Sequence, residues 1–149
     1  MLLTQAQAVY ENFTDAGKQR RAGPVAQFGD GSTMERPKWP HDSPICYKFQ
    51  PGSDPWTQEL MRKAAQYWTE NTCLTWQEGC TSKPTVMIHT NGNGCYTTPG
   101  RGFTKVSITT RGTQRTYNPV FDDEQEMSLS APGCDWLATT LHEASHVMG

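Results

Sequence analysis

Two parts of the chain place hydrophobic residues at the spacing of an amphipathic helix. The first is the segment 55–70. Asp54 precedes it and Pro55 is its first residue, an N-cap and first-turn pair that typically opens a helix. Its apolar positions share one helical face and predict burial: Leu60, Ala64, Tyr67 and Trp68. The second is expected to be opened by Asp135 and to run through WLATTLHEASHVM to Gly149. Its apolar stripe predicts a packed helix: Leu137, Leu141, Ala144 and Met148.

Short runs rich in β-branched and aromatic residues predict four strands, at 44–49, 73–77, 85–90 and 104–110. Turn-forming segments such as NGNG and TTPGRG separate them, and the segment 111–134 is polar and irregular. The order strand, helix, strands, helix predicts an α+β lobe. We expect a mixed, mostly parallel sheet with one helix behind it and one helix carrying the functional site.

The N-terminal region has a different character. Residues 2–13 predict a short amphipathic helix, and residues 14–38 have no hydrophobic period and are interpreted as a linker. The linker contains a basic cluster at 18–21, which is either a processing site or a solvated run of charge. Asn12-Phe13-Thr14 fits a glycosylation sequon.

Length and charge exclude several classes of protein. The 149 residues suffice for one domain with its own core, and a net charge of −2 gives no reason to expect nucleic acid or an anionic membrane as partner. No apolar run reaches the roughly 18 residues of a membrane span. The start, MLLTQAQA, is too short in apolar residues for a signal peptide, so a secreted protein would carry its targeting segment outside this chain.

Five cysteines are too widely spaced for a C-x-x-C metal or redox site. Scattered cysteines favour disulfides and an oxidising compartment, and buried free thiols are the alternative. Because the count is odd, at least one thiol is free or has its partner outside the chain.

The second predicted helix carries the candidate chemistry, the motif H-E-x-x-H at His142, Glu143 and His146. Residues four apart share a helix face, so both imidazoles can reach one metal ion. A catalytic Zn²⁺ binds such nitrogens and keeps one position for water, and Glu143 lies where it can accept the proton of that water. The motif therefore predicts peptide hydrolysis by a zinc-bound water with Glu143 as general base.

Gly149 follows the second histidine by three residues and allows a left-handed turn out of the helix. A third histidine would then approach the metal in the pattern H-E-x-x-H-x-x-G-x-x-H, and we expect it beyond the last residue of this chain.

The sequence around this motif, and much of the chain before it, resembles the astacin metalloendopeptidases. GCDWLATTLHEASHVMG is similar to their active-site segment, and RPKWPHDSPICYKF, AQYWTENTCLTWQE and TVMIHTNGNGC are similar to their opening strand, first helix and edge strand. These segments cover about residues 36–149 in the family's order. The resemblance implies the N-terminal lobe of a metzincin-type protease at 22–149, without its C-terminal lobe. It also implies a propeptide remnant at 1–21, since LLTQAQA is similar to the stretch that follows a Phe-x-Gly-Asp motif in some propeptides of the family. In latent members the Asp of that motif occupies the open position of the zinc and so acts as a switch. Phe28-Gly29-Asp30 is a weaker rival for that switch.

The resemblance implies further assignments. Cys95 and Cys134 match a pair that forms a disulfide in the family, and Cys73 matches a cysteine whose partner lies in the absent lobe. Cys46 and Cys80 have no counterpart in the basic family pattern. Because they lie in the middle of one predicted strand and just past the end of another, they are candidates to pair with each other. The strand 85–90 would be the edge that holds an extended substrate, and His89 on it is not a metal ligand.

The leading hypothesis is a secreted, zymogen-derived zinc endopeptidase with one Zn²⁺ per catalytic domain and polypeptide substrates. Two alternatives are a non-catalytic fragment that binds partners and a protease of another clan with a Glu ligand. With only two of its three ligands present, the chain alone is expected to be inactive.

Overall fold

The computed structural model describes residues 26–27, 33–34 and 37–149. The predictions for the helix at 2–13, the sequon at 12–14, the basic cluster at 18–21 and the segment 28–30 lie outside the described residues. Within the expected linker, strand β1 (Ala26–Gln27) pairs antiparallel with strand β2 (Thr33–Met34), so this segment contains a short ladder that was not predicted.

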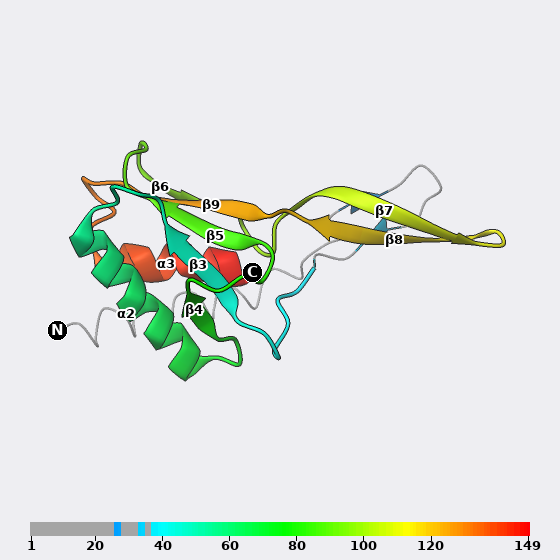
Figure 1. Cartoon of the computed structure of the whole chain (residues 1–149), viewed down its shortest axis with the longest axis horizontal. Coiled ribbons are helices and arrows are strands. Elements are labelled where there is room, and N and C mark those ends of the chain that lie inside the picture. Colours follow the sequence, from blue (N-terminus) through cyan, green and yellow to red (C-terminus); the bar gives the residue numbers. More distant parts are fainter. Residues whose placement is uncertain (1–25, 28–32, 35–36) are drawn as a thin grey trace.

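A five-stranded mixed sheet forms the centre of the molecule, in the order β4-β3-β5-β9-β6 (Figure 1). Strands β4 (Trp76–Glu78), β3 (Ile45–Phe49), β5 (Thr85–His89) and β9 (Glu124–Leu129) are parallel, whereas β6 (Cys95–Thr97) runs antiparallel to β9 at one edge. This arrangement confirms the predicted α+β class with a mostly parallel sheet.

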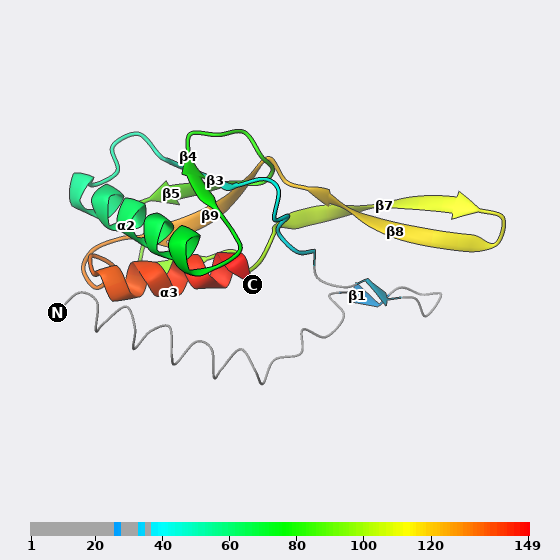
Figure 2. The same ribbon diagram turned by 90° about the horizontal axis from the view of Figure 1, so that it is seen from below.

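Both long helices cover the same face of this sheet (Figure 2). Helix α2 (Pro55–Asn71) begins where predicted, because the side chain of Asp54 accepts a hydrogen bond from the backbone N–H of Thr57. Helix α3 (Leu137–Met148) packs against α2 and β6. Fully buried side chains from the sheet fill the space beneath the helices: Ile45, Val86, Ile88, Met127 and Leu129.

The start of α3 differs from the prediction. Its N-cap is Trp136, which makes no capping hydrogen bond through its side chain, and Asp135 instead accepts from the backbone N–H of Gly133. Asp135 therefore stabilises the turn before the helix. At the other end, Gly149 has φ +93°, the left-handed conformation expected there.

A second sheet consists of strands β7 (Phe103–Arg111) and β8 (Gln114–Phe121), an antiparallel hairpin that projects from the body of the molecule (Figures 1 and 2). The strand predicted at 104–110 therefore exists but lies outside the main sheet.

Three sequence-based predictions about strands were wrong. The strand expected at 73–77 is shifted to Trp76–Glu78, because residues 72–74 end helix α2 through hydrogen bonds of the Thr72 hydroxyl. The segment 85–90 is the middle strand of the sheet, and β6 is the edge. The segment 111–134, expected to be irregular, contains β8 and β9.

The sequence analysis missed strand β9 because some of its buried positions have polar side chains. Gln125 is 5% exposed, and its side-chain amide accepts from Gly102 N–H and donates to the carbonyl oxygens of Thr98 and Gly100. Ser128 is also fully buried and donates to the carbonyl of Gly94. Hydrogen bonds allow these side chains to be buried at little cost, so the strand has no hydrophobic signature in the sequence.

Candidate metal centre on helix α3

The two histidines of the H-E-x-x-H motif lie side by side on the exposed face of α3. Their Nε2 atoms are 2.9 Å apart, and their ring planes are nearly perpendicular, at 88°. Both side chains are exposed, whereas Leu141, Ala144 and Val147 on the opposite face are fully buried. The helix therefore presents two convergent imidazole nitrogens on the side away from its packed face.

This geometry fits a shared zinc ion. Two nitrogen ligands of a tetrahedral zinc, each about 2.0–2.1 Å from the ion, lie about 3.3 Å apart. The observed 2.9 Å between Nε2 atoms needs only a small opening of the two side chains to reach that value. In the part of the chain that the structure describes, no third His, Cys, Asp or Glu completes a metal-binding group.

Glu143 lies between the two histidines in the sequence and is 7% exposed. Among the described residues, its carboxylate forms no hydrogen bond or ion pair, so both oxygens are available as acceptors. A carboxylate next to a candidate metal ligand in the sequence, with both oxygens available, is a candidate for a general base.

Distant parts of the chain fix the ligand helix through its carbonyl groups. The Trp68 indole N–H, from α2, donates to the carbonyl of Leu141 at 3.2 Å, and the Trp39 indole N–H donates to that of Val147 at 2.7 Å. The backbone N–H of Gly100 donates to the carbonyl of His146 at 2.8 Å. The carbonyls at 146 and 147 belong to the last turn, where helices run out of intrahelical donors, and the bond from Trp39 satisfies a buried acceptor there.

A disulfide between Cys95 and Cys134 joins strand β6 to the turn that precedes α3. A second disulfide, Cys46–Cys80, joins β3 to the segment after β4. These are the two pairs that the sequence analysis suggested, the first through the family resemblance and the second from the positions of Cys46 and Cys80 relative to the predicted strands. Cys73 is exposed and has no disulfide partner within the described residues.

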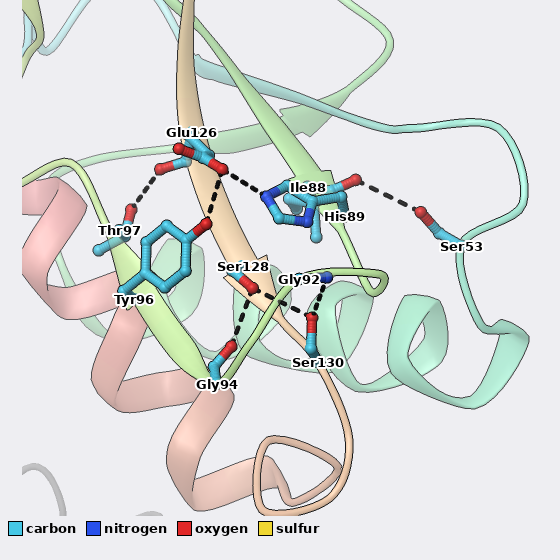
Figure 3. A network of polar contacts seen from close by, with 10 residues as sticks. All are labelled: Ser53, Ile88, His89, Gly92, Gly94, Tyr96, Thr97, Glu126, Ser128 and Ser130. Atoms are coloured by element: carbon cyan, nitrogen blue, oxygen red, sulfur yellow. Dashed lines mark hydrogen bonds and ion pairs between the residues drawn. The ribbon is translucent and has the colours of Figure 1, made fainter.

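On the sheet face opposite the helices, a polar network links the edge strand β6 to its neighbours (Figure 3). The Tyr96 hydroxyl donates to a carboxylate oxygen of Glu126 at 2.8 Å, and the same oxygen lies 2.6 Å from His89 Nε2. His89 is thus engaged on the open face and lies outside the pair on α3. The hydrogen bonds from Tyr96 and His89 hold the pKa of Glu126 below its ordinary value, and the bond from Tyr96 makes the larger contribution.

A glycine closes this network. A Cβ atom at Gly92 would lie 2.9 Å from His89 Cε1 and 3.0 Å from Ser128 Oγ, so the loop can approach these side chains only with glycine there. The N–H of Gly92 donates to Ser130 Oγ at 2.8 Å. Sequence reasoning missed the whole network, because its members are dispersed along the chain and no motif joins them; Gly92 and Ser130 alone are 38 residues apart.

A shallow hollow of about 360 Å³ lies at the root of the β7–β8 hairpin. Its walls include Arg101, Asp122, Glu124 and Glu126, but none of the residues of the H-E-x-x-H motif. We take the convergent histidines, rather than this hollow, as the candidate site, because they place two metal-binding nitrogens 2.9 Å apart on one helix face.

Among the described residues, no helix is both long enough and apolar enough to cross a membrane.

Comparisons with known proteins show which family the chain is similar to. The sequence model of the family described as Astacin, a family of peptidases, matches residues 31–117. The chain is 27% identical to "Protein SpAN" of Strongylocentrotus purpuratus over all of its own length and 21% of the relative's. It is 29% identical to "Zinc metalloproteinase dpy-31" of Caenorhabditis elegans, over 97% of this chain and 21% of that one. The chain thus spans about a fifth of the length of these relatives.

Among solved structures, the fold is similar to that of high choriolytic enzyme 1, a hatching enzyme zinc-protease from Oryzias latipes. The TM-score is 0.54 at 16% identity, and the match covers 85% of this chain and 53% of the other. This likeness supports the fold.

Proposed function

Because the chain belongs to the astacin family of peptidases, we propose that its activity is that of a zinc-dependent metalloendopeptidase. The observation that supports this most strongly is the convergence of His142 and His146, with 2.9 Å between their Nε2 atoms and the carboxylate of Glu143 beside them in the helix. The relatives named as zinc metalloproteinases favour the same activity.

In this proposal, His142 and His146 hold the metal through their Nε2 atoms, and a third ligand comes from outside the described residues. When bound, zinc polarises the scissile carbonyl and acidifies the adjacent water. Glu143 accepts the proton of the attacking water as its oxygen bonds to the carbonyl carbon. The same carboxylate then delivers that proton to the nitrogen of the departing amine, so its charge is restored after each turnover.

The extended substrate would lie along β6. This strand is an edge of the main sheet and contacts α3, so its unpaired backbone groups are next to the ligand helix. An extended peptide can add to such an edge through main-chain hydrogen bonds. The Cys95–Cys134 disulfide connects the edge strand to the segment before α3 and so supports a fixed distance between the bound peptide and the histidines.

Secretion and activation complete the proposal. Two disulfides in a chain of this size favour an extracellular or otherwise oxidising compartment. Residues 1–21 would be a propeptide remnant and 22–149 the peptidase region, with cleavage at or just after the basic cluster 18–21. N-terminal sequencing of the active protein tests this boundary, and an active form that begins at Met1 would contradict it.

The experiment that tests the proposed activity uses the protein as the cell produces it. Casein hydrolysis should stop when a zinc chelator is added and return when Zn²⁺ is restored. His142→Ala should abolish both zinc binding and hydrolysis, whereas His41→Ala, which removes an exposed histidine before β3, should affect neither. Hydrolysis that survives the chelator or the His142→Ala substitution would refute the proposal.

A further inference from the structure

The β7–β8 hairpin has the position of a binding arm. It extends away from the main sheet, and within the described residues its two strands pair only with each other (Figures 1 and 2). A two-residue connection at Gly112-Thr113 joins the strands, and Gly112 has φ +63°, as such tight hairpin turns require. Among the described residues, neither strand of the hairpin packs extensively against another helix or strand.

The register identifies the backbone groups that face outward. Because Arg111 and Gln114 flank a two-residue turn, they form a hydrogen-bonded pair, and hydrogen-bonded pairs alternate with non-bonded ones along the ladder. The N–H and C=O groups of the alternate residues Val106, Ile108 and Thr110 therefore point away from β8. Together they form an unpaired strand edge, three outward-facing residues long, on the described hairpin.

The corresponding edge of β8 is interrupted. Pro119 stands opposite Val106 in the register and has no N–H, so one outward donor of β8 is missing. Proteins use proline to prevent strand addition at an exposed edge. On β7, the bulge between Phe103 and Lys105 interrupts the ladder only at its root, and the edge beyond it is continuous. The hairpin is thus protected on one side and open on the other.

The charge of the hairpin indicates what would bind there. Between residues 103 and 121 it has three cations, Lys105, Arg111 and Arg115, and no Asp or Glu. None of the three forms an ion pair with any described residue, although the whole chain has a net charge of −2. The acidic residues at the root are already engaged in part, since Asp123 pairs with Lys83 and Glu124 with Lys48.

We propose that the hairpin is a docking arm, to which an extended acidic segment of a partner polypeptide adds as a third strand alongside β7. Main-chain hydrogen bonds to Val106, Ile108 and Thr110 would supply the pairing, and the hairpin's cations would favour acidic side chains. Ile108, whose side chain is 57% exposed, would be covered by the added strand. A second copy of the chain is a poorer occupant, because two cationic hairpins repel each other. The inference does not depend on the proposed peptidase activity.

The test measures binding of a labelled peptide of alternating threonine and glutamate to the 149-residue chain. We expect this peptide to bind and one of alternating threonine and lysine not to bind. The double substitution Arg111→Glu/Arg115→Glu should raise the Kd about tenfold, equivalent to about 1.4 kcal/mol. The matched control, Lys38→Glu/Lys63→Glu, makes the same change in net charge at exposed positions outside the hairpin and should leave the Kd unchanged.

A second pair of variants separates strand addition from simple charge attraction. Ile108→Pro removes an outward N–H without removing a ladder hydrogen bond, and should abolish binding. Ile108→Thr keeps that N–H and should bind. In exchange experiments, the amide protons of 106, 108 and 110 should become protected when the peptide is added. Each variant is compared only after its Trp68 and Trp76 indole resonances are shown to match the wild type.

Three results would overturn the proposal. The first is equal binding by the wild type and the Arg111→Glu/Arg115→Glu variant, and the second is equal binding by the Ile108→Pro and Ile108→Thr variants. The third is protection of the 106, 108 and 110 amides without peptide, increasing with protein concentration, which would identify a second copy as the occupant.

Discussion

The indole N–H of Trp39 donates a hydrogen bond to the backbone carbonyl of Val147 at 2.7 Å, across 108 residues of chain. Val147 directly follows His146, and its carbonyl belongs to the last turn of α3, where helices run out of intrahelical donors. Trp39 is 4% exposed, so the carbonyl it satisfies would otherwise be buried beside the tryptophan without a donor. The segment before β3 thereby fixes the position of a candidate zinc ligand.

Trp39→Phe tests this relationship. The substitution keeps an aromatic ring but removes the donor, and we expect the free energy of unfolding to fall by about 1–3 kcal/mol, the cost of an unsatisfied buried acceptor. Denaturant unfolding of the 149-residue chain measures it. The matched control is Trp56→Phe, since the Trp56 indole also donates to a carbonyl, that of Asp135, but its side chain is 55% exposed. Equal losses in the two variants would contradict the account.

The sequence was sufficient to predict features that local chemistry determines. Asp54 and Pro55 encode the start of α2, and the apolar stripe of α3 encodes the face that packs. The four-residue spacing of His142 and His146 places both on one face of the helix, whatever the rest of the fold. Because each of these depends on neighbours in sequence, no knowledge of the tertiary structure was needed.

The features that could not be predicted depend on distant partners. Gln125 is tolerated in a buried strand only because Thr98, Gly100 and Gly102 supply its hydrogen bonds. Strand β6 has only three residues, too few for a hydrophobic pattern, and its position as the sheet edge follows from pairing with β9. Likewise, nothing in the sequence 104–110 distinguishes a strand of the main sheet from one of a projecting hairpin.

The Cys95–Cys134 disulfide should contribute directly to stability. Replacing both cysteines with alanine should lower the free energy of unfolding by about 2–5 kcal/mol, since the bond closes a loop with a sequence separation of 39 residues. Cys73→Ala, which removes an exposed cysteine outside both disulfides, should have little effect in the 149-residue chain. Non-reducing peptide mapping of the wild type provides the check, and a free thiol at Cys95 or Cys134 in folded protein would refute the pairing.

The hydrogen bonds to Glu126 predict a specific dependence of stability on pH. Because the pKa of Glu126 is below its ordinary value of 4.5 in the folded state, its stabilising contribution is fully present above about pH 4.5. The contribution is lost as the pH falls through the folded-state pKa. With 53% of the side chain exposed, solvent screening limits it to less than about 1 kcal/mol.

The comparison that tests this prediction is the unfolding free energy of Glu126→Gln against that of the wild type. The wild type should be the more stable at about pH 7, and the difference should shrink as the pH falls through the lowered folded-state pKa of Glu126, where its carboxylate takes up a proton. Glu59→Gln is the charge-matched control, since Glu59 is exposed and makes no hydrogen bond within the described residues. A difference between Glu126→Gln and wild type that stays constant with pH would show that the hydrogen bonds to the carboxylate contribute nothing.

One paired measurement of zinc content and peptide hydrolysis tests most directly the roles proposed for Glu143 and the two histidines. In the protein as the cell produces it, Glu143→Gln should retain zinc at the wild-type stoichiometry while hydrolysis falls by about 10²–10⁴-fold, the usual contribution of a general base. His146→Gln should lose both zinc and hydrolysis. If Glu143→Gln instead hydrolyses peptide within about tenfold of the wild-type rate, or loses zinc as His146→Gln does, Glu143 is not the base and the account is wrong.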